Sequence, residues 1–289
     1  MRIDFILNPV AGNGFALRTM ETLKLLAEAR GQDIRVHRTE RPGHGTLLAK
    51  RLSEDPGVEL AVAVGGDGTC GEVAAGLTGS KTPMGIIPAG TGNDFIKVAG
   101  IPKDPQAAFE FLLNHSPRPV DTGRVNDQFF LNVCGTGFDV TVLDYAEEEK
   151  KKHRGLTPYL LGLLKAISHY KPVELSLREG GKESKEKLLI CSIANGRYIG
   201  GGIPICPVAD ITDGMLDLVM VQNVPRSAIP RYLPGLMTKK VLTFRITSHR
   251  LVKEVTLAGK GLRINIDGEI RPMDQVTFRV VPHSLLLVC

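Results

Sequence analysis

Two short glycine-rich segments constrain the fold of this chain more than any other feature. Residues 65–69 read Gly-Gly-Asp-Gly-Thr and residues 88–95 read Pro-Ala-Gly-Thr-Gly-Asn-Asp-Phe. Each follows a short apolar run, at residues 60–64 and 84–87, of the kind typical of buried strands in a parallel sheet. A helical pattern follows the first segment at Glu72, Val73, Ala75 and Leu77. The pattern therefore predicts neighbouring strand–turn–helix units.

The residue types in these loops suit a phosphate. Glycine adopts positive φ angles and lets a ligand approach bare backbone N–H groups. A strand, a glycine turn and a helix N-terminus together form a site for a phosphate-sized anion. Asp67 would repel that anion unless a cation lay between them, so we interpret it as a partner of Mg²⁺, directly or through water. Plain connecting turns without a ligand are the alternative.

Length and cysteine usage restrict the class of protein. The chain has 289 residues, 43% of them hydrophobic, which is enough for one large or two ordinary domains. No apolar run reaches the roughly 18–20 residues of a membrane helix, so we expect no transmembrane segment. The N-terminal residues enter a strand pattern at once, unlike a signal peptide. The cysteines are five in number and show no CxxC spacing, which favours a reduced, cytoplasmic protein.

Charge indicates the kind of partner. A net charge of +5 suits nucleotides or acidic lipid surfaces, but it is too small and diffuse to predict nucleic-acid binding. Two stretches are solvated surface or contacts to anionic lipid head groups: the charge run at residues 147–154, which ends in the basic residues 150–154, and the basic set Arg226, Arg231, Lys239, Lys240 and Arg245. The second interpretation predicts transient association with a membrane surface. The oligomeric state stays open, a homodimer included.

The first part of the chain alternates strands and helices. Strands are expected at residues 3–7 and 34–36, the latter ending near Thr39, and helices after Gly14, at 44–52 and at 104–113. With the two glycine segments, this alternation predicts a doubly wound α/β domain over residues 1–118. The turn after its first strand, from Asn8 to Gly14, is where such folds hold nucleotides, although Asn8 is equally explained as a turn former.

After the Ser-Pro-Arg-Pro run at 116–119 the pattern changes to short strands separated by turns. It predicts a second, β-sandwich domain over residues 119–281 with one helical interruption near residues 159–167. The expected strands are 129–134, 173–177, 188–194, 215–221, 242–246, 255–257, 262–266 and 276–281.

Four motifs, which occur in this order along the chain, together resemble one protein family. They are Asn8-Pro9 with Gly12, the Gly-Gly-Asp-Gly-Thr loop, the Gly-Thr-Gly-Asn-Asp-Phe loop, and Asp-Gly-Glu at residues 267–269. Together they resemble the diacylglycerol kinase catalytic domain family, in particular its stand-alone soluble bacterial lipid kinases, over nearly the whole chain. NAD kinases and phosphofructokinase-like enzymes carry loops similar to the first glycine loop. The second loop and the late Asp-Gly-Glu separate lipid kinases from them.

The resemblance implies a nucleotide site between the two domains. Asp67 would lie at the phosphate–Mg²⁺ end, and Glu269 matches the position proposed as general base for the lipid hydroxyl. A plain surface hairpin turn is the alternative for Glu269. The nucleotide-contacting positions would be Asn8, Pro9, Gly12, Thr39, Gly65, Gly66, Asp67, Gly68, Thr69, Glu72 and Thr91, with Asn93 and Asp94 lining the same cleft.

Residues 207–217 resemble the family's second metal loop. Asp213 would supply a carboxylate, Asp210 and Met215 would offer backbone carbonyls, and Asp121 matches an aspartate that links the metal to the active site. Ordinary turn formation is the alternative for Asp210 and Asp213. Whether such a metal is structural or catalytic stays open. The resemblance also allows residues 282–289 to return to the first domain.

The resemblance implies an ATP- and Mg²⁺-dependent lipid kinase, with diacylglycerol as the first expected substrate and a phosphatidate as product. The chemistry agrees, because phosphoryl transfer depends on positioning and charge neutralisation and an alcohol nucleophile gains from a carboxylate that accepts its proton. An NAD kinase, and a non-catalytic nucleotide- or lipid-binding regulator of the same fold, are the alternatives. The sequence does not identify the lipid.

Overall fold

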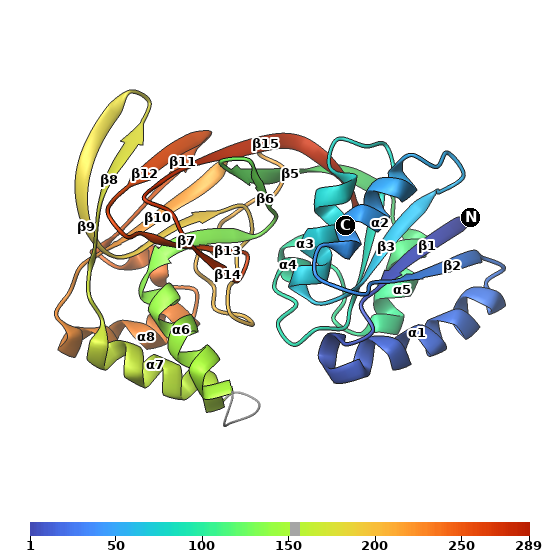
Figure 1. The fold of residues 1–289 in the computed structure, drawn as a ribbon, viewed down its shortest axis with the longest axis horizontal. Helices are drawn as coiled ribbons and strands as arrows, with labels where there is room; N and C mark the ends of the chain where they lie inside the picture. Colours follow the sequence, from blue (N-terminus) through green and yellow to red (C-terminus); the bar gives the residue numbers. More distant parts are fainter. Residues whose placement is uncertain (151–156) are drawn as a thin grey trace.

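The first half of the molecule is a parallel sheet covered by helices on both faces (Figure 1). The computed structural model describes residues 1–150 and 157–289. The elements of this half are β1 (Arg2–Leu7), α1 (Ala11–Ala29), β2 (Asp33–Arg38), α2 (His44–Ser53), β3 (Leu60–Gly65), α3 (Asp67–Leu77), β4 (Met84–Pro88), α4 (Phe95–Ala99) and α5 (Pro105–Asn114).

The strand order β2-β1-β3-β4 is parallel throughout. Figure 1 shows α1 and α5 on one face of this sheet and α2 and α3 on the other, so the doubly wound arrangement predicted from the sequence is confirmed. The order reverses between β1 and β3, and a crevice at such a reversal is where open α/β sheets bind ligands. β3 and β4 are buried along their whole length, which explains their unbroken apolar sequences.

The second half is built from antiparallel strands, as predicted, with helices along one side. Its elements are β5 (Pro117–Val125), β6 (Gln128–Phe130), β7 (Val133–Gly137), α6 (Phe138–Lys150), α7 (Thr157–His169), β8 (Val173–Glu179), β9 (Lys182–Ala194), β10 (Leu216–Gln222), α8 (Ile229–Met237), β11 (Thr247–Val252), β12 (Glu254–Ala258), β13 (Arg263–Ile266), β14 (Glu269–Pro272) and β15 (Gln275–Val288). Two short 3₁₀ helices, at Arg226–Ala228 and Val241–Thr243, flank α8.

Two sequence-based strand predictions are wrong. Residues 242–246 do not form a strand: Val241–Thr243 is a 3₁₀ helix, and pairing with β10 begins only at Thr247. Their alternating apolar side chains instead pack under α8, where the Phe244 and Tyr232 ring centroids are 5.1 Å apart. Residues 129–134 are split between β6 and β7. The helices α6 and α8 were not predicted.

One long strand joins the two halves. β15 pairs with β5 from Phe278 to Val288 and reaches the first sheet, where Leu287 pairs with Met84 of β4. Leu285 and Leu287 are buried in the core of the α/β half. Through this strand, the sheets of the two halves are connected by continuous backbone hydrogen bonding.

No helix in the described part of the chain is long and apolar enough to span a membrane. Of the first predicted basic stretch, residues 151–154 lie outside the described residues.

Candidate active site

Three loops meet at the carboxyl ends of β1, β3 and β4. The backbone N–H of Asn8 donates to the Val64 carbonyl at 3.1 Å, and that of Ala89 donates to the Gly65 carbonyl at 2.7 Å. The Asn8 side chain donates through Nδ2 to Thr69 Oγ1 at 3.1 Å. The sequence-predicted loops at residues 8–14, 65–69 and 88–95 are therefore one contiguous structure at the switch point of the sheet.

Glycine is required where the two main loops touch. A Cβ atom on Gly90 would lie 2.3 Å from the Cα of Gly66, and one on Gly12 would lie 2.4 Å from the Ala89 carbonyl oxygen. Gly12 also has a φ of +58°, which disfavours other residues. By contrast Gly68 is exposed, with nothing within 4 Å of its Cβ position. Packing explains Gly12, Gly66 and Gly90, whereas Gly68 keeps backbone open beside Asp67.

Gly90→Ala should destabilise the protein by about 2 kcal/mol, because backbone atoms cannot move aside as a flexible side chain could. The matched control is Gly71→Ala in α3, where a Cβ would meet nothing within 4 Å. That control should gain about 0.5–1 kcal/mol from helix propensity. Urea unfolding of both variants measures the difference, and equal stabilities would contradict the close approach of the two loops.

Asp67 lies at the centre of this structure. Its Oδ1 accepts the backbone N–H groups of Asp94 at 2.6 Å and Phe95 at 3.1 Å. Among the described residues its Oδ2 has no hydrogen-bond partner, and a Cβ on Gly92 would lie only 2.8 Å from it. Burial, assisted by the charge of Asp94, raises the pKa of Asp67 above its ordinary value. A carboxylate that is costly to ionise and has one free oxygen suits a divalent cation.

Asp94 connects the two halves of the molecule. Its Oδ1 pairs with Lys97 Nζ at 2.6 Å, and its Oδ2 accepts the backbone N–H of Gly201, in the second half, at 2.8 Å. Asn93, with a φ of +50°, bonds both the N–H and the carbonyl of Gly90. Both side chains are therefore used to shape the loop and its interdomain contact.

Lys97 is a site residue that the sequence-based search missed. Its ammonium lies 5.5 Å from the ring centroid of Tyr198 in the second half, as well as beside Asp94. The available signal was its spacing, because Lys97 follows Asp94 by three residues at the start of a helix. A cation at this position places positive charge at the rim of the glycine loops.

The remaining predicted nucleotide contacts fall into two groups. Glu72 uses both carboxylate oxygens inside the chain, accepting the N–H groups of Gly43 and Gly45 at 2.7 and 2.8 Å. It therefore holds the start of α2, and a side-chain contact to a nucleotide would have to compete with these bonds. The other positions lie around the loops: Pro9 follows β1, Thr39 donates its N–H to the carbonyl of Leu7, and Thr91 is exposed.

The Asp-Gly-Glu motif forms the turn between β13 and β14. Both turn residues have positive φ angles, which are +48° at Asp267 and +101° at Gly268. Ile266 pairs with Glu269 across this two-residue hairpin. Asp267 accepts the N–H groups of Leu131, Asn132 and Val133, at 2.6, 2.9 and 3.0 Å. These bonds end β6 and start β7, which explains why the predicted strand at 129–134 is interrupted.

Glu269 lies beside this turn with its side chain 73% exposed and 2.9 Å from Arg271. The hairpin faces the α/β half in Figure 1. Burial raises the pKa of Asp267 to about 6, and the negative charge of Asp67 contributes to that rise. The two motifs are distant in sequence, yet their carboxylates are close enough to repel each other.

The raised pKa of Asp267 predicts an unusual pH dependence. The folded protein binds this proton more tightly than the unfolded chain, so ionisation of Asp267 favours unfolding. Compared with Asp267→Asn, which also suits the turn, the wild type should lose up to about 3 kcal/mol of stability as the pH rises from about 4 to about 6. Thermal melts across this range test the sign. A constant difference between the two proteins would contradict it.

The predicted second metal loop lies at the β5–β15 junction. Asp121, fully buried on β5, accepts the N–H groups of Gly214 and His283, each at 2.7 Å. Asp210 accepts the N–H and hydroxyl of Thr212, and Asp213 accepts the N–H of Met215 at 2.9 Å.

These contacts bear on whether the carboxylates of that loop could hold a metal ion. Burial and the charges of Asp217, Asp210 and Asp121 raise the pKa of Asp213. The loop is therefore acidic and ordered by its own side chains, and both Asp210 and Asp213 are exposed. Carboxylates in this arrangement suit a hard cation. In the described part of the chain, no hydrogen bond or ion pair joins this loop to Asp67.

Comparisons with known proteins agree with this architecture. Residues 2–125 match the sequence model of the diacylglycerol kinase catalytic domain, and residues 132–289 match that of the YegS C-terminal NAD kinase beta sandwich-like domain. A diacylglycerol kinase of Mycobacterium tuberculosis (strain CDC 1551 / Oshkosh) is 30% identical over 98% of this chain and 94% of its own length. A protein of Pseudomonas putida (strain KT2440) named as a YegS-like lipid kinase is 36% identical over 83% and 80%.

Solved structures share the fold. A crystal structure of a protein from Bacillus anthracis strain Sterne superposes with a TM-score of 0.80 at 24% identity, covering 99% of this chain and 97% of that one. A diacylglycerol kinase structure from the same strain gives 0.76 at 22%, covering 99% and 96%. The two family models together span residues 2–125 and 132–289, and these ranges contain all four sequence motifs. This chain belongs to the diacylglycerol kinase and YegS-like family of lipid kinases.

Proposed function

We propose that this protein is an ATP- and Mg²⁺-dependent kinase that transfers the γ-phosphate to a lipid hydroxyl, with diacylglycerol as first substrate and phosphatidate as product. One observation carries the proposal. The carboxylate of Asp67, with one oxygen free of hydrogen bonds among the described residues, lies in glycine loops that the Asp94–Gly201 hydrogen bond joins to the second half, and the β13–β14 turn of that half carries Glu269. This contact between the halves supports a site built from the motifs of both.

The residues fit the groups that the proposal requires. Asp67 offers a carboxylate oxygen to a hard cation, and glycine at position 92 leaves that oxygen uncovered. The α3 N-terminus and the exposed backbone at Gly68 offer N–H groups to phosphate oxygens. Lys97 adds positive charge at the rim. When bound, Mg²⁺ neutralises charge on the transferring phosphate.

Each residue has a distinct role in this proposal. Asp67 holds the cation, the glycine loops position the phosphates, and Glu269 accepts the proton of the lipid hydroxyl as that oxygen attacks phosphorus. The high exposure of Glu269 leaves it accessible to an acceptor arriving from a lipid surface. Asp94 keeps the second loop attached to the second half through Gly201.

The experiment is transfer of labelled γ-phosphate from ATP, with Mg²⁺, to lipids in mixed micelles, with NAD as a parallel acceptor. The panel contains diacylglycerol, ceramide, sphingosine and phosphatidylglycerol. Labelled phosphatidate supports the proposal. Label on another lipid would support the same reaction with a different substrate. Label on NAD would show an NAD kinase. Retained ATP binding without any transfer would favour a regulator and overturn the proposal.

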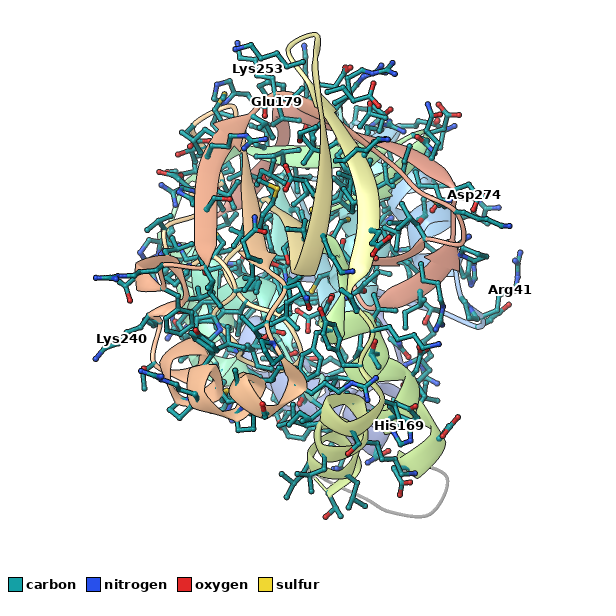
Figure 2. The ribbon with its side chains drawn as sticks, turned by 90° about the vertical axis from the view of Figure 1, so that its left-hand side faces the viewer. Arg41, His169, Glu179, Lys240, Lys253 and Asp274 are labelled. Atoms are coloured by element: carbon teal, nitrogen blue, oxygen red, sulfur yellow. The ribbon has the colours of Figure 1, made fainter. Side chains whose placement is uncertain are left out.

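We also propose that the end of the second half bearing α7 and α8 binds an anionic membrane surface transiently. Leu160 and Leu164 on α7 are 58% and 54% exposed, and Met237 on α8 is 59% exposed. The two leucines lie one helical turn apart, so they share a face of α7. Figures 1 and 2 show both helices at the end opposite the β8–β9 hairpin, and in Figure 2 Lys240 points away from the protein. Arg231, Lys239 and Arg245 are exposed on or next to α8.

Replacing both Leu160 and Leu164 with glutamine should reduce binding to phosphatidylglycerol-containing vesicles by about 10-fold, because about 1.5 kcal/mol or more of apolar insertion is lost. Leu25→Gln is the control, since Leu25 is also exposed but lies on α1 of the other half. Vesicle co-sedimentation measures both. Equal losses of vesicle binding in the double variant and in Leu25→Gln would contradict the assignment of this α7 face to the membrane.

A further inference from the structure

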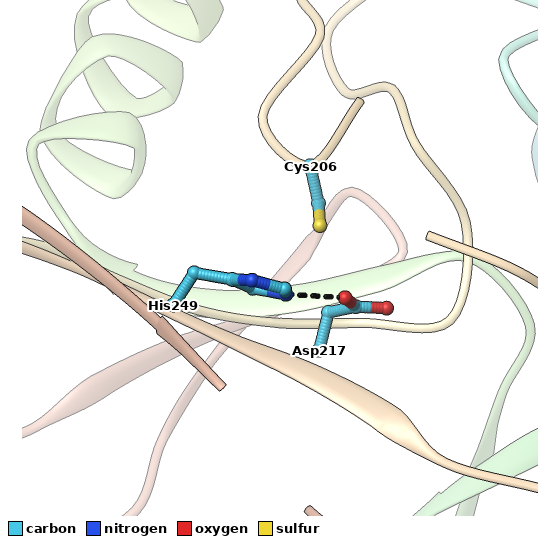
Figure 3. Close-up of side chains that lie close together, drawn as sticks. All are labelled: Cys206, Asp217 and His249. Carbon is cyan, nitrogen blue, oxygen red and sulfur yellow. Dashed lines mark hydrogen bonds and ion pairs between the residues drawn. The ribbon is translucent and has the colours of Figure 1, made fainter. Parts of the chain in front are cut away.

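A thiol, a carboxylate and an imidazole converge in the second half of the molecule (Figure 3). They belong to Cys206, Asp217 and His249, and their ligand atoms all lie within 4.8 Å of one another. His249 Nε2 lies 2.5 Å from Asp217 Oδ1. No sequence motif predicted this cluster, because its members come from three separate segments.

The fold positions the three side chains firmly. Asp217 lies on β10 and His249 on β11, where His249 pairs with Val219, so the two side chains are diagonal neighbours on one face of the sheet. Cys206 comes from the loop above that face, held by backbone bonds to Arg197 and Ala209. Figure 3 shows its sulfur directed toward the other two groups.

The charge of Asp217 has little compensation within the chain. Asp217 and Cys206 are buried, and in the described residues no lysine or arginine forms an ion pair with Asp217. His249 is the one basic partner found there, and it is charged only when protonated. A buried carboxylate without a lasting positive partner is costly, and a bound cation would remove that cost.

We propose that Cys206, Asp217 and His249 form a binding site for a Zn²⁺-like transition-metal ion. Sulfur, nitrogen and oxygen ligands together are typical of zinc, whereas Mg²⁺ takes oxygen ligands. A tetrahedral ion would hold such ligand atoms about 3.3–3.7 Å apart, so shifts of about 1 Å convert the cluster into a ligand set. The His249 side chain is 28% exposed, which leaves an approach for a water as fourth ligand.

Binding requires no redox partner. A bond forms between the metal and Cys206 Sγ, and the thiol proton passes to solvent. The proton between His249 Nε2 and Asp217 Oδ1 also leaves, either to Nδ1 of the same ring as a change of tautomer or to solvent, so that the neutral imidazole donates its Nε2 lone pair and Asp217 binds as a carboxylate. The ion would fasten the loop that carries Cys206 onto β10 and β11. That loop runs from the Gly201 contact to Asp213, so the metal would stabilise the connection between the two halves.

Titration of the metal-free protein with Co²⁺, followed by displacement with Zn²⁺, tests the site without any kinase substrate. We expect one equivalent of Co²⁺ to produce a sulfur-to-cobalt charge-transfer band and the visible bands of tetrahedral cobalt. Zn²⁺ should abolish both and raise Tm by about 5 °C at saturation. A wild-type protein that binds no Co²⁺ or Zn²⁺, or binds them without a sulfur band, would overturn the proposal.

Variants assign the ligands. Cys206→Ala should remove the charge-transfer band, and His249→Gln should weaken Zn²⁺ binding by more than about 100-fold while keeping the thiol. The control Cys191→Ala removes another buried thiol of the same half and should keep the full spectrum. Should Cys206→Ala fail to fold, His249→Gln and the wild-type titration still decide. An unchanged affinity in His249→Gln would overturn the proposed ligand set.

Discussion

Asp67→Asn should lower kcat/KM for Mg·ATP by about 10³-fold, because removing one preorganised charge from the site of phosphoryl transfer has an effect of this size. The substitution is nearly isosteric. Its amide oxygen can still accept the N–H groups of Asp94 and Phe95, so the start of α4 stays capped. Initial rates over a range of Mg²⁺ and ATP concentrations measure the loss.

The stability of Asp67→Asn, unlike its activity, should not fall. Burial raises the pKa of Asp67, so the folded protein bears a cost for its ionised form that an amide does not have. We therefore expect a Tm of Asp67→Asn equal to or above that of the wild type. The control is Asp127→Asn, an exposed aspartate in the β5–β6 turn that should change neither quantity. Unchanged Mg·ATP kinetics in Asp67→Asn would remove Asp67 from the site.

Glu269→Gln should lower kcat by about 10²–10⁴-fold, the range that a positioned general base contributes. ATP affinity should stay unchanged, because the phosphate loops lie in the other half and the ion pair that Glu269 forms is with Arg271 of its own hairpin. Stability should also stay unchanged, since the Glu269–Arg271 pair is exposed and such pairs contribute little. Single-turnover phosphate transfer and ATP-binding calorimetry separate the two effects.

The matched control for Glu269→Gln is Glu183→Gln. Glu183 is also exposed and arginine-paired, and it lies on the β8–β9 hairpin of the same half. It should retain wild-type turnover. Near-normal turnover in Glu269→Gln would exclude the general-base role and return the Asp-Gly-Glu motif to a simple hairpin turn. Asp67→Asn and Glu269→Gln thus differ in one readout, because only the first should impair the use of Mg·ATP.

Local sequence determined the α/β half almost completely. Short apolar runs ending in glycine turns specify β3 and β4, because a strand buried on both faces needs an unbroken apolar sequence. The Asp-Gly turn at residues 267–268 also follows from local backbone preferences. Sequence patterns failed where apolar side chains pack against a helix and do not belong to a paired strand. The alternating apolar residues at 242–246 pack against α8 and its neighbours. The helix α8 itself was not predicted, because it contains Pro234.

The roles of the polar side chains were decided by tertiary structure. Glu72 and Asp121 are carboxylates in plausible motifs, yet the structure uses both oxygens of each to hold distant backbone N–H groups. Lys97 pairs with Asp94 through local spacing, but its contact with the ring of Tyr198 exists only because the fold brings that residue from the other half.

The reason is physical. Strand and turn preferences act between neighbours along the chain, so the sequence by itself determined the glycine loops, the strands before them and the Asp-Gly turn. Burial and electrostatic repulsion depend on what the folded chain brings together. Only the tertiary structure, through the β15 strand shared by both halves, brought the charge of Asp67 near enough to raise the pKa of Asp267 and brought Cys206, Asp217 and His249 together.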